Sequence, residues 1–157
     1  MILKGIIYED FVNYKKISMY ISFPYCSFKC DKEFGCQICQ NGSLANTENI
    51  NISLDRIVDR YINNPISEAV VMAGLEPMDS FEELMELISA FRDKTEDDIV
   101  IYTGYYKDEI LDKIDELSSF KNIIIKFGRF IPYQEKHYDK VLGVYLASDN
   151  QYAERVS

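Results

Sequence analysis

Apolar residues recur along the chain in two patterns, short runs and helical stripes, and the two patterns alternate. The short runs, rich in β-branched residues, predict strands at residues 17–23, 68–72, 98–102, 122–127 and 141–146. The stripes, with apolar residues at the i, i+3, i+4 and i+7 spacing, predict helices that begin at Ser53, at a capping box formed by Ser80 and Glu83, and near Ile110. Such alternation is typical of a parallel sheet with crossover helices.

The sequence therefore predicts an α/β fold with a mostly parallel sheet, either open or closed partway into an incomplete βα barrel. A complete eight-fold barrel needs about 250 residues, and this chain has 157, which predicts a single domain over residues 1–157. In both architectures ligands bind at the carboxyl ends of the strands. The loops that follow the first three predicted strands should therefore meet on one rim.

All four cysteines of the chain lie in the first of these loops, at Cys26, Cys30, Cys36 and Cys39. Thiolates suit zinc, copper(I) and iron–sulfur clusters. The N-terminus lacks a signal-peptide pattern, and no stretch approaches the roughly 18 apolar residues of a membrane span. We therefore expect a cytoplasmic protein without a membrane partner, in which clustered thiols bind metal more often than they form disulfides.

Residue types and spacing leave three interpretations of this loop open. A structural zinc site in a non-catalytic, protein-binding module would use all four cysteines, although only five residues separate the two pairs. A redox dithiol would use Cys36 and Cys39 alone. An iron–sulfur cluster bound through three cysteines would leave one iron open for a substrate.

Charge narrows the range of partners. The formal net charge is −9, and the lysines are scattered, whereas a nucleic-acid-binding surface needs a basic stripe. We therefore expect no nucleic-acid partner. Lys29 and Lys32 flank the cysteines and would tune the potential of a cluster through their charge, but solvated loop lysines are the ordinary interpretation.

Several short segments, in order along most of the chain, resemble one branch of the radical S-adenosyl-L-methionine (SAM) superfamily. That branch contains the activating enzymes of anaerobic ribonucleoside-triphosphate reductase. Cys39-Gln40-Asn41 resembles the Cys-x-Asn ending of the branch's cysteine loop, and Gly74-Leu75-Glu76-Pro77 resembles its Gly-Gly-Asp/Glu-Pro turn. Tyr102-Thr103-Gly104-Tyr105 is similar to its aromatic-Thr-Gly-Tyr segment. Near the C-terminus, Gly128-Arg129-Phe130 is similar to its Gly-Arg/Lys-Phe segment, and Ser148-Asp149-Asn150-Gln151 to its Ser-x-Asn-Gln segment.

The sequence departs from this pattern twice. The family spacing is Cys-x3-Cys-x2-Cys, whereas Cys30 and Cys39 are separated by eight residues that include Cys36. Because the residues around Cys39 carry the match, we predict Cys39 as the third ligand, with Cys36 as the alternative. Leu75 replaces the second glycine of the turn, which is acceptable if its φ is negative.

The resemblance implies a partial βα barrel of the radical SAM type and specific roles for several residues. Cys26, Cys30 and Cys39 would hold a [4Fe-4S] cluster that reductively cleaves SAM to methionine and a 5′-deoxyadenosyl radical. The turn formed by Gly74, Leu75 and Glu76 would meet the methionine amino group of SAM. Backbone groups near Ile38 would face the adenine, and Thr103 would reach the ribose or the carboxylate.

The resemblance also implies a partner. The protein would be an oxidoreductase that generates a glycyl radical on a large enzyme, foremost anaerobic ribonucleotide reductase. A small electron donor such as flavodoxin or ferredoxin would supply electrons. Another glycyl-radical enzyme, a peptide or a small metabolite is the alternative target.

Overall fold

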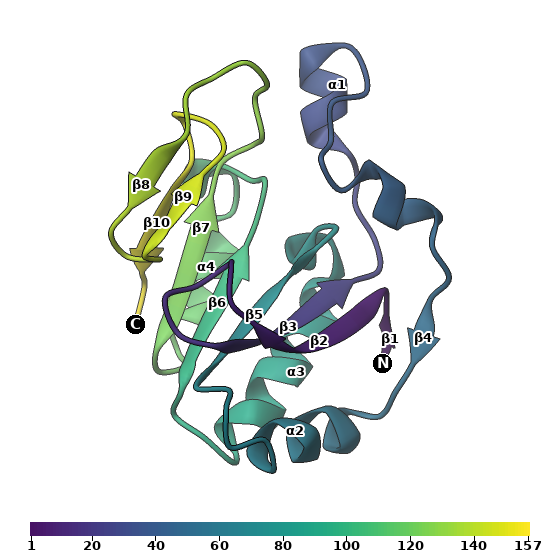
Figure 1. The fold of residues 1–157 in the computed structure, drawn as a ribbon, viewed down its shortest axis with the longest axis vertical. Helices are drawn as coiled ribbons and strands as arrows, with labels where there is room; N and C mark the ends of the chain where they lie inside the picture. Colours follow the sequence, from purple (N-terminus) through teal and green to yellow (C-terminus); the bar gives the residue numbers. More distant parts are fainter.

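The computed structural model describes residues 1–157 and is built around one six-stranded sheet (Figure 1). Its strands, in the spatial order β10-β7-β6-β5-β3-β2, are Tyr152–Arg155, Ile123–Phe127, Asp98–Tyr102, Ala69–Gly74, Ser18–Phe23 and Gly5–Asp10. The four central strands are parallel, and β2 and β10 add antiparallel edges. The predicted α/β class with a mostly parallel sheet is therefore confirmed.

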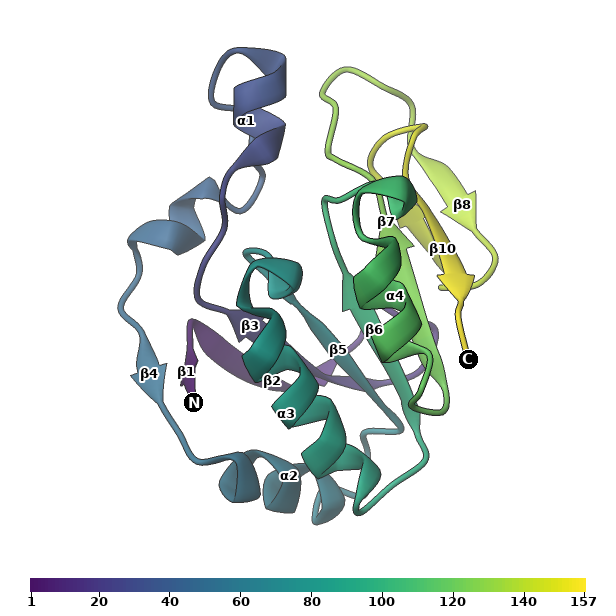
Figure 2. The same ribbon diagram turned by 180° about the vertical axis from the view of Figure 1, so that it is seen from behind.

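Three helices join the central strands, and all three pack on the same face of the sheet. They are α2 (Leu54–Ile62), α3 (Phe81–Arg92) and α4 (Leu111–Leu117). The crossovers advance across the sheet in one direction, from β3 to β5, β6 and β7, so crossovers of one hand leave every helix on one side. Figure 2 shows α3 and α4 in front of the sheet.

The hydrophobic core consequently has two unequal parts. The larger part, with 22 buried residues, lies between the sheet and the three helices. The smaller part, with nine, lies on the opposite face, where Tyr14, Leu142 and Leu146 cover the middle of the sheet. No helix covers this second face, so a site can form on it at the carboxyl ends of the parallel strands.

The remaining elements are short. A two-stranded ribbon joins β1 (Ile2–Leu3) to β4 (Ile50–Asn51), and a hairpin joins β8 (His137–Asp139) to β9 (Val144–Leu146). Helix α1 (Lys29–Phe34) projects from the cysteine loop (Figure 1). The 3-10 turns are Gly42–Asn46, Pro77–Ser80 and Lys107–Glu109. No helix is both long and apolar enough to cross a lipid bilayer.

Two local predictions have different outcomes. Ser53 caps α2 as predicted, because its side chain accepts a hydrogen bond from the backbone N–H of Arg56 at 3.4 Å. The capping box at Ser80 is wrong, because Ser80 makes no side-chain cap hydrogen bond. The chain enters α3 from a 3-10 turn, which Glu76 caps instead by accepting a hydrogen bond from Met78 N–H.

An ion-pair network around the buried Asp98 carboxylate fixes the amino end of β6, opposite the cysteine loop, although its two cations, Lys16 and Arg155, are partly exposed. The Asp98 carboxylate pairs with Lys16 at 2.6 Å and with Arg155 at 2.7 Å, and it accepts a hydrogen bond from the Tyr14 hydroxyl at 3.0 Å. Burial raises the pKa of Asp98, but the hydrogen bonds from these three partners outweigh burial and lower the pKa to about 2. The ionised carboxylate therefore stabilises the fold.

We expect Asp98→Asn to destabilise the protein by about 1–3 kcal/mol at pH 7, because it removes the charge that satisfies these donors. The folded pKa lies below the unfolded value of about 3.9. The contribution is thus complete above that value and disappears as the pH falls towards 2. Urea unfolding at several pH values measures it, with the exposed Asp115→Asn on α4 as control. A difference that stays constant between pH 7 and pH 2.5 would contradict this account.

Candidate functional site

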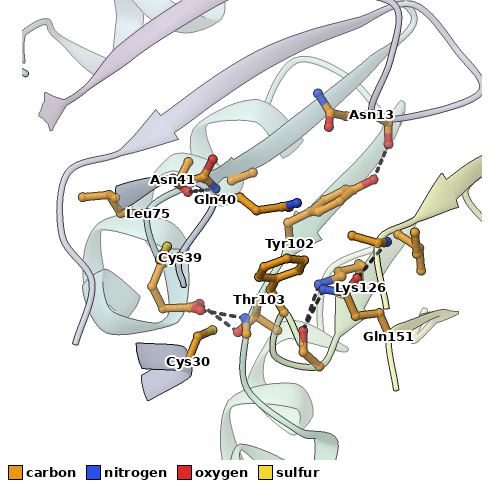
Figure 3. Close-up of a pocket in the computed structure, with 18 of the residues that line it drawn as sticks. Asn13, Cys30, Cys39, Gln40, Asn41, Leu75, Tyr102, Thr103, Lys126 and Gln151 are labelled. Atoms are coloured by element: carbon orange, nitrogen blue, oxygen red, sulfur yellow. Dashed lines mark hydrogen bonds between the residues drawn. The ribbon is translucent and has the colours of Figure 1, made fainter. Parts of the chain in front are cut away.

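A cavity of about 300 Å³ opens at the carboxyl ends of the parallel strands, on the face that no helix covers (Figure 3). Four of its lining residues, Tyr20, Ala73, Tyr102 and Lys126, come from the four adjacent parallel strands and lie on one face of the sheet. The small Ala73 side chain lies between the strands of the two tyrosines and leaves space there. The volume is within the range of about 300–1,000 Å³ that is usual for ligand sites.

Three of the four cysteines line this cavity. Cys26, Cys30 and Cys39 contribute to its wall, whereas Cys36 is exposed and lies outside it. All four thiols are free. The predicted convergence of the loops on one rim is confirmed, because the cysteine loop, the turn at Gly74 and the turn at Thr103 and Gly104 all line this cavity.

Both ends of the cysteine loop are tied to the turn that follows β5. At the start of the loop, the Asp79 carboxylate accepts a hydrogen bond from Ser27 N–H at 2.7 Å. At its end, the Asn41 amide donates to the Gly74 carbonyl at 2.8 Å. These two bonds hold Cys26 and Cys39 beside the cavity.

The long segment between Cys30 and Cys39 folds back on itself. It forms α1, which ends at Gly35 in the left-handed conformation, with φ 82°. Asp31 then accepts hydrogen bonds from the backbone N–H groups of Ile38 and Cys39, both at 2.8 Å. The insertion is thus closed at its base and leaves Cys36 on its outer side.

A buried arginine connects this insertion to the body of the protein. The Arg129 guanidinium, only 2 % exposed, makes two 2.7 Å hydrogen bonds to the Glu109 carboxylate and lies 2.9 Å from the carboxylate of Glu33 on α1. The hydrogen bond from Arg129 lowers the pKa of Glu109 to about 2. The same pairing raises the pKa of Arg129. Both groups therefore stay charged.

The Gly128-Arg129-Phe130 and Ser148-Asp149-Asn150-Gln151 segments meet beside the cavity. The Asn150 amide donates to the Arg129 carbonyl at 2.8 Å, and the Gln151 amide donates to the Gly128 carbonyl at 3.3 Å. A Cβ on Gly128, whose φ is 99°, would lie 2.7 Å from the Asn150 carbonyl oxygen. The glycine is thus required for this close approach, which places Gln151 in the cavity wall.

The turn after β5 depends on a second glycine. Gly74 has a φ of 91°, and a Cβ there would lie 2.7 Å from the Cα of Ser22 on the neighbouring strand. No other residue type fits without displacing the backbone. Leu75, which follows it, is not among the residues with positive φ. The condition under which leucine replaces the second glycine is therefore met.

Glu76 lies at the centre of the rim and is only 5 % exposed. Its carboxylate accepts three hydrogen bonds, from the Thr103 hydroxyl at 2.8 Å, Gly104 N–H at 2.8 Å and Met78 N–H at 3.1 Å. Burial raises the pKa of Glu76 to about 7, and the three hydrogen bonds act in the opposite direction. Since all three neighbours donate, the arrangement suits an ionised carboxylate.

The remaining predicted site residues differ in how they face the cavity. The Thr103 hydroxyl donates to Glu76 and accepts from Tyr105 N–H at 3.0 Å, so its hydrogen bonds lie within the protein. Ile38 does not line the cavity. The structure thus gathers all the other predicted site residues around one space: Cys26, Cys30, Cys39, Gly74, Leu75, Glu76 and Thr103.

Sequence reasoning missed Lys126, which lines the same cavity and is 6 % exposed. Its ammonium donates to the Gly128 carbonyl at 2.9 Å, and it lies 5.9 Å from the centre of the Tyr102 ring. Figure 3 shows it beside Tyr102 and Gln151. A signal was present, since a lysine interrupts the otherwise apolar run of β7.

The three cavity thiols lie in surroundings that favour their protonated form. Burial raises the pKa of Cys26 to about 12, and it also raises the pKa values of Cys30 and Cys39. A metal centre bound there must therefore displace protons. No three His, Cys, Asp or Glu side chains converge closely enough to hold a single metal ion.

Comparison with known proteins identifies the class of this site. A family model described as a 4Fe-4S single cluster domain matches residues 15–152, which is most of the chain. The protein is therefore an iron–sulfur protein. It belongs to the family of 4Fe-4S single cluster domains. No curated protein and no solved structure matches the chain.

The cavity suits the [4Fe-4S] cofactor that this family membership supports. Each cysteine ligand of such a cluster binds a different iron, so the thiols need to surround a space and not a single point. Cys26, Cys30 and Cys39 do surround one, and thiolates are the preferred ligands of such clusters. Gly104 leaves space beside Cys30, because a Cβ at this position would be in contact with the Cys30 sulfur at 3.6 Å. The donor set therefore fits the cofactor.

Replacing Glu76 by glutamine should destabilise the metal-free protein by about 1–3 kcal/mol. A glutamine amide has one oxygen and one NH₂ group, so at least one of the three donors would face another donor. Denaturant unfolding measures the loss, and amide exchange at Gly104 should accelerate. Glu86→Gln, an exposed position on α3, is the matched control. If the two variants unfold alike, Glu76 does not hold the two turns together.

Proposed function

We propose that the protein is a radical SAM activating enzyme that reductively cleaves S-adenosylmethionine and generates a glycyl radical on a partner enzyme. One observation carries the proposal. Three cysteines, the turn at Gly74 and the turn at Thr103 and Gly104 border one cavity at the carboxyl ends of parallel strands. These segments resemble those of the activating-enzyme branch, and this resemblance is the reason for proposing SAM cleavage as the reaction. Family membership supplies the iron–sulfur cofactor.

In this proposal Cys26, Cys30 and Cys39 hold the cluster, and one iron stays open for SAM. When bound and reduced, the cluster supplies the electron that breaks a carbon–sulfur bond of SAM, giving methionine and a 5′-deoxyadenosyl radical. The exposed position of Cys36 supports this choice of ligands.

The chain itself orients SAM and restricts access of water to the reacting atoms. The backbone of Gly74 and Leu75 faces the methionine portion, and the buried Glu76 carboxylate places negative charge near its ammonium group. Thr103 acts by positioning Glu76, to which its hydroxyl donates. The Ile38 N–H already donates to Asp31, so any contact of this segment with adenine would use other backbone groups.

The fold also supports a radical SAM enzyme, and we propose that its sheet is a shortened partial βα barrel. Three successive crossovers advance in one direction and leave the helices on one face, as in the winding of a βα barrel. The cavity then occupies the position of a barrel interior, at the end where βα barrels bind ligands. The antiparallel strands β2 and β10 would end the barrel on either side.

A large glycyl-radical enzyme, foremost anaerobic ribonucleotide reductase, is the proposed partner, with a small donor such as flavodoxin or ferredoxin. The exposed aromatic residues Tyr25 and Phe34 belong to the cysteine loop, and Tyr145 is exposed while it also lines the cavity. Exposed aromatic side chains beside a reaction site suit a docked protein loop.

Separate alanine variants of Cys36 and Cys39 test the ligand assignment. After anaerobic reconstitution, we expect Cys36→Ala to retain about four irons per chain, as a cubane cluster requires. Cys39→Ala should lose most of its iron, because the cavity then offers only two thiols. Iron and sulfide analysis with electron paramagnetic resonance (EPR) of the reduced cluster measures both. Loss of the cluster in Cys36→Ala alone would show that Cys36 is the ligand.

SAM cleavage tests the reaction. The reconstituted protein, reduced with dithionite, should form methionine and 5′-deoxyadenosine, whereas Cys39→Ala should form neither. Incubation with a candidate reductase should then produce the EPR signal of a glycyl radical on the large protein. Cleavage without this signal would redirect the proposal to another glycyl-radical enzyme, a peptide or a metabolite. Bound zinc without cleavage would contradict it and support the four-cysteine zinc module.

A further inference from the structure

Lys126 is the one buried cation of the cavity wall, and no carboxylate forms an ion pair with it, although Glu76 lines the same cavity. Its side chain comes from the penultimate residue of β7, between the apolar Ile125 and Phe127, and lines the cavity. An ammonium group has three donors, but only one hydrogen bond is present, to the neutral carbonyl of Gly128. Lys126 forms no ion pair.

Such a group is costly to bury. An unpaired charge in a protein interior costs several kcal/mol, on the order of the net stability of a small domain. Accordingly, burial lowers the pKa of Lys126 to about 8. A strand position facing a cavity accommodates methionine or leucine readily, so the lysine indicates an anion that binds in the cavity.

Two sources of negative charge share the cavity with Lys126, namely the Glu76 carboxylate and the three cysteines. Glu76 already accepts three hydrogen bonds, whereas the cysteines would become thiolates only when a cluster binds. Lys126 and the three cysteines line the same cavity, so a cluster held by the cysteines would share that cavity with the ammonium. Three thiolates outweigh the positive charge of an oxidised [4Fe-4S] core, and reduction adds one more electron. The negative charge of the site therefore grows in the step that the cofactor must perform.

We propose that Lys126 is the buried counter-cation of the cluster, which stabilises the reduced form and so raises the reduction potential. It is a positioning and tuning residue and makes no bond to iron. The inference rests on the proposed placement of the cluster at Cys26, Cys30 and Cys39, but not on SAM cleavage or on the identity of the partner.

The lysines next to the cysteines in sequence are poorer candidates for this role. The Lys29 ammonium pairs with Glu109 at 3.3 Å and stacks 4.2 Å from the centre of the Tyr105 ring, so its charge is already compensated. Lys32 is exposed on α1. Water and salt screen a charge at the surface, whereas a buried charge is screened much less.

The experiment compares Lys126→Met with Lys32→Met, which removes the same charge from a surface position. Each reconstituted protein is titrated with dithionite in the absence of SAM, and EPR records the midpoint potential. We expect Lys126→Met to shift the midpoint to a more negative value and Lys32→Met to leave it near that of the wild type. Lys126→Arg, which keeps the charge, should have a midpoint potential close to that of the wild type.

If Lys126 had a purely structural role, its replacement by methionine would lower the melting temperature of the metal-free protein. The counter-cation role predicts otherwise. Because methionine removes an unpaired buried charge and keeps the volume, we expect metal-free Lys126→Met to melt at the same or a higher temperature than the wild type. Failure of the wild type to bind a cluster at these cysteines would contradict the proposed function itself. A wild type with a cluster but an unchanged midpoint in Lys126→Met would overturn this inference alone.

A second source of anionic charge is the carboxylate of SAM, and a binding measurement distinguishes it. The Kd for SAM is measured with each oxidised, reconstituted protein. Loss of a charged hydrogen bond weakens binding about tenfold or more. If Lys126→Met weakens SAM binding by this factor and leaves the midpoint potential unchanged, Lys126 binds the SAM carboxylate. The inference would then be wrong. A shifted midpoint with unchanged SAM affinity supports it.

Discussion

The arrangement of the site depends on one buried carboxylate that serves two loops at once. Glu76 follows β5, and two of its three hydrogen-bond donors, Thr103 and Gly104, follow β6. Parallel strands bring their carboxyl ends to one edge, but they leave the loops beyond that edge free to diverge. A charged acceptor with three donors removes this freedom, because each donor would otherwise be buried without a partner. The two loops are held together for that reason.

The cysteine loop tolerates its insertion because the rim supplies both of its anchors. Asp79 and Gly74, which bind the start and the end of the loop, belong to the turn region after β5. Any segment that begins and ends at these anchors leaves Cys26 and Cys39 at the cavity, whatever its length in between. Loop closure costs little more as a loop lengthens, and the hydrogen bonds of Asp31 close the base of this one. The extra residues therefore form α1 outside the site.

The sequence predicted the central strands and the site rim because both depend on local patterns. Apolar runs predicted β3, β5, β6 and β7 within one or two residues. The resemblance of the residues around Cys39 to a family motif pointed to the three cavity thiols. The antiparallel edges β2 and β10 were missed, and the strand expected at 141–146 became β9 in a separate hairpin. Their pairing depends on contacts between distant segments, which periodicity does not reveal. The capping box at Ser80 failed because a preceding turn changed how the chain enters α3.

Lys126 illustrates a different reason for a missed residue. Its position on β7 follows the strand pattern, and the departure lies in residue type alone, which becomes informative only once the strand is known to face a cavity. The same view clarifies Glu76, whose negative charge is compensated by three hydrogen-bond donors. The Lys126 ammonium, by contrast, makes one hydrogen bond to a neutral carbonyl. Burial lowers the pKa of Lys126, and the charge of Glu76 raises it without a direct ion pair. Glu76 and Lys126 are buried, carry opposite charges and form no ion pair with each other, so the electrostatic potential differs between the two sides of the cavity. A centre bound in this cavity would therefore share it with an ammonium that retains free donors, while the donors around Glu76 remain occupied by that carboxylate.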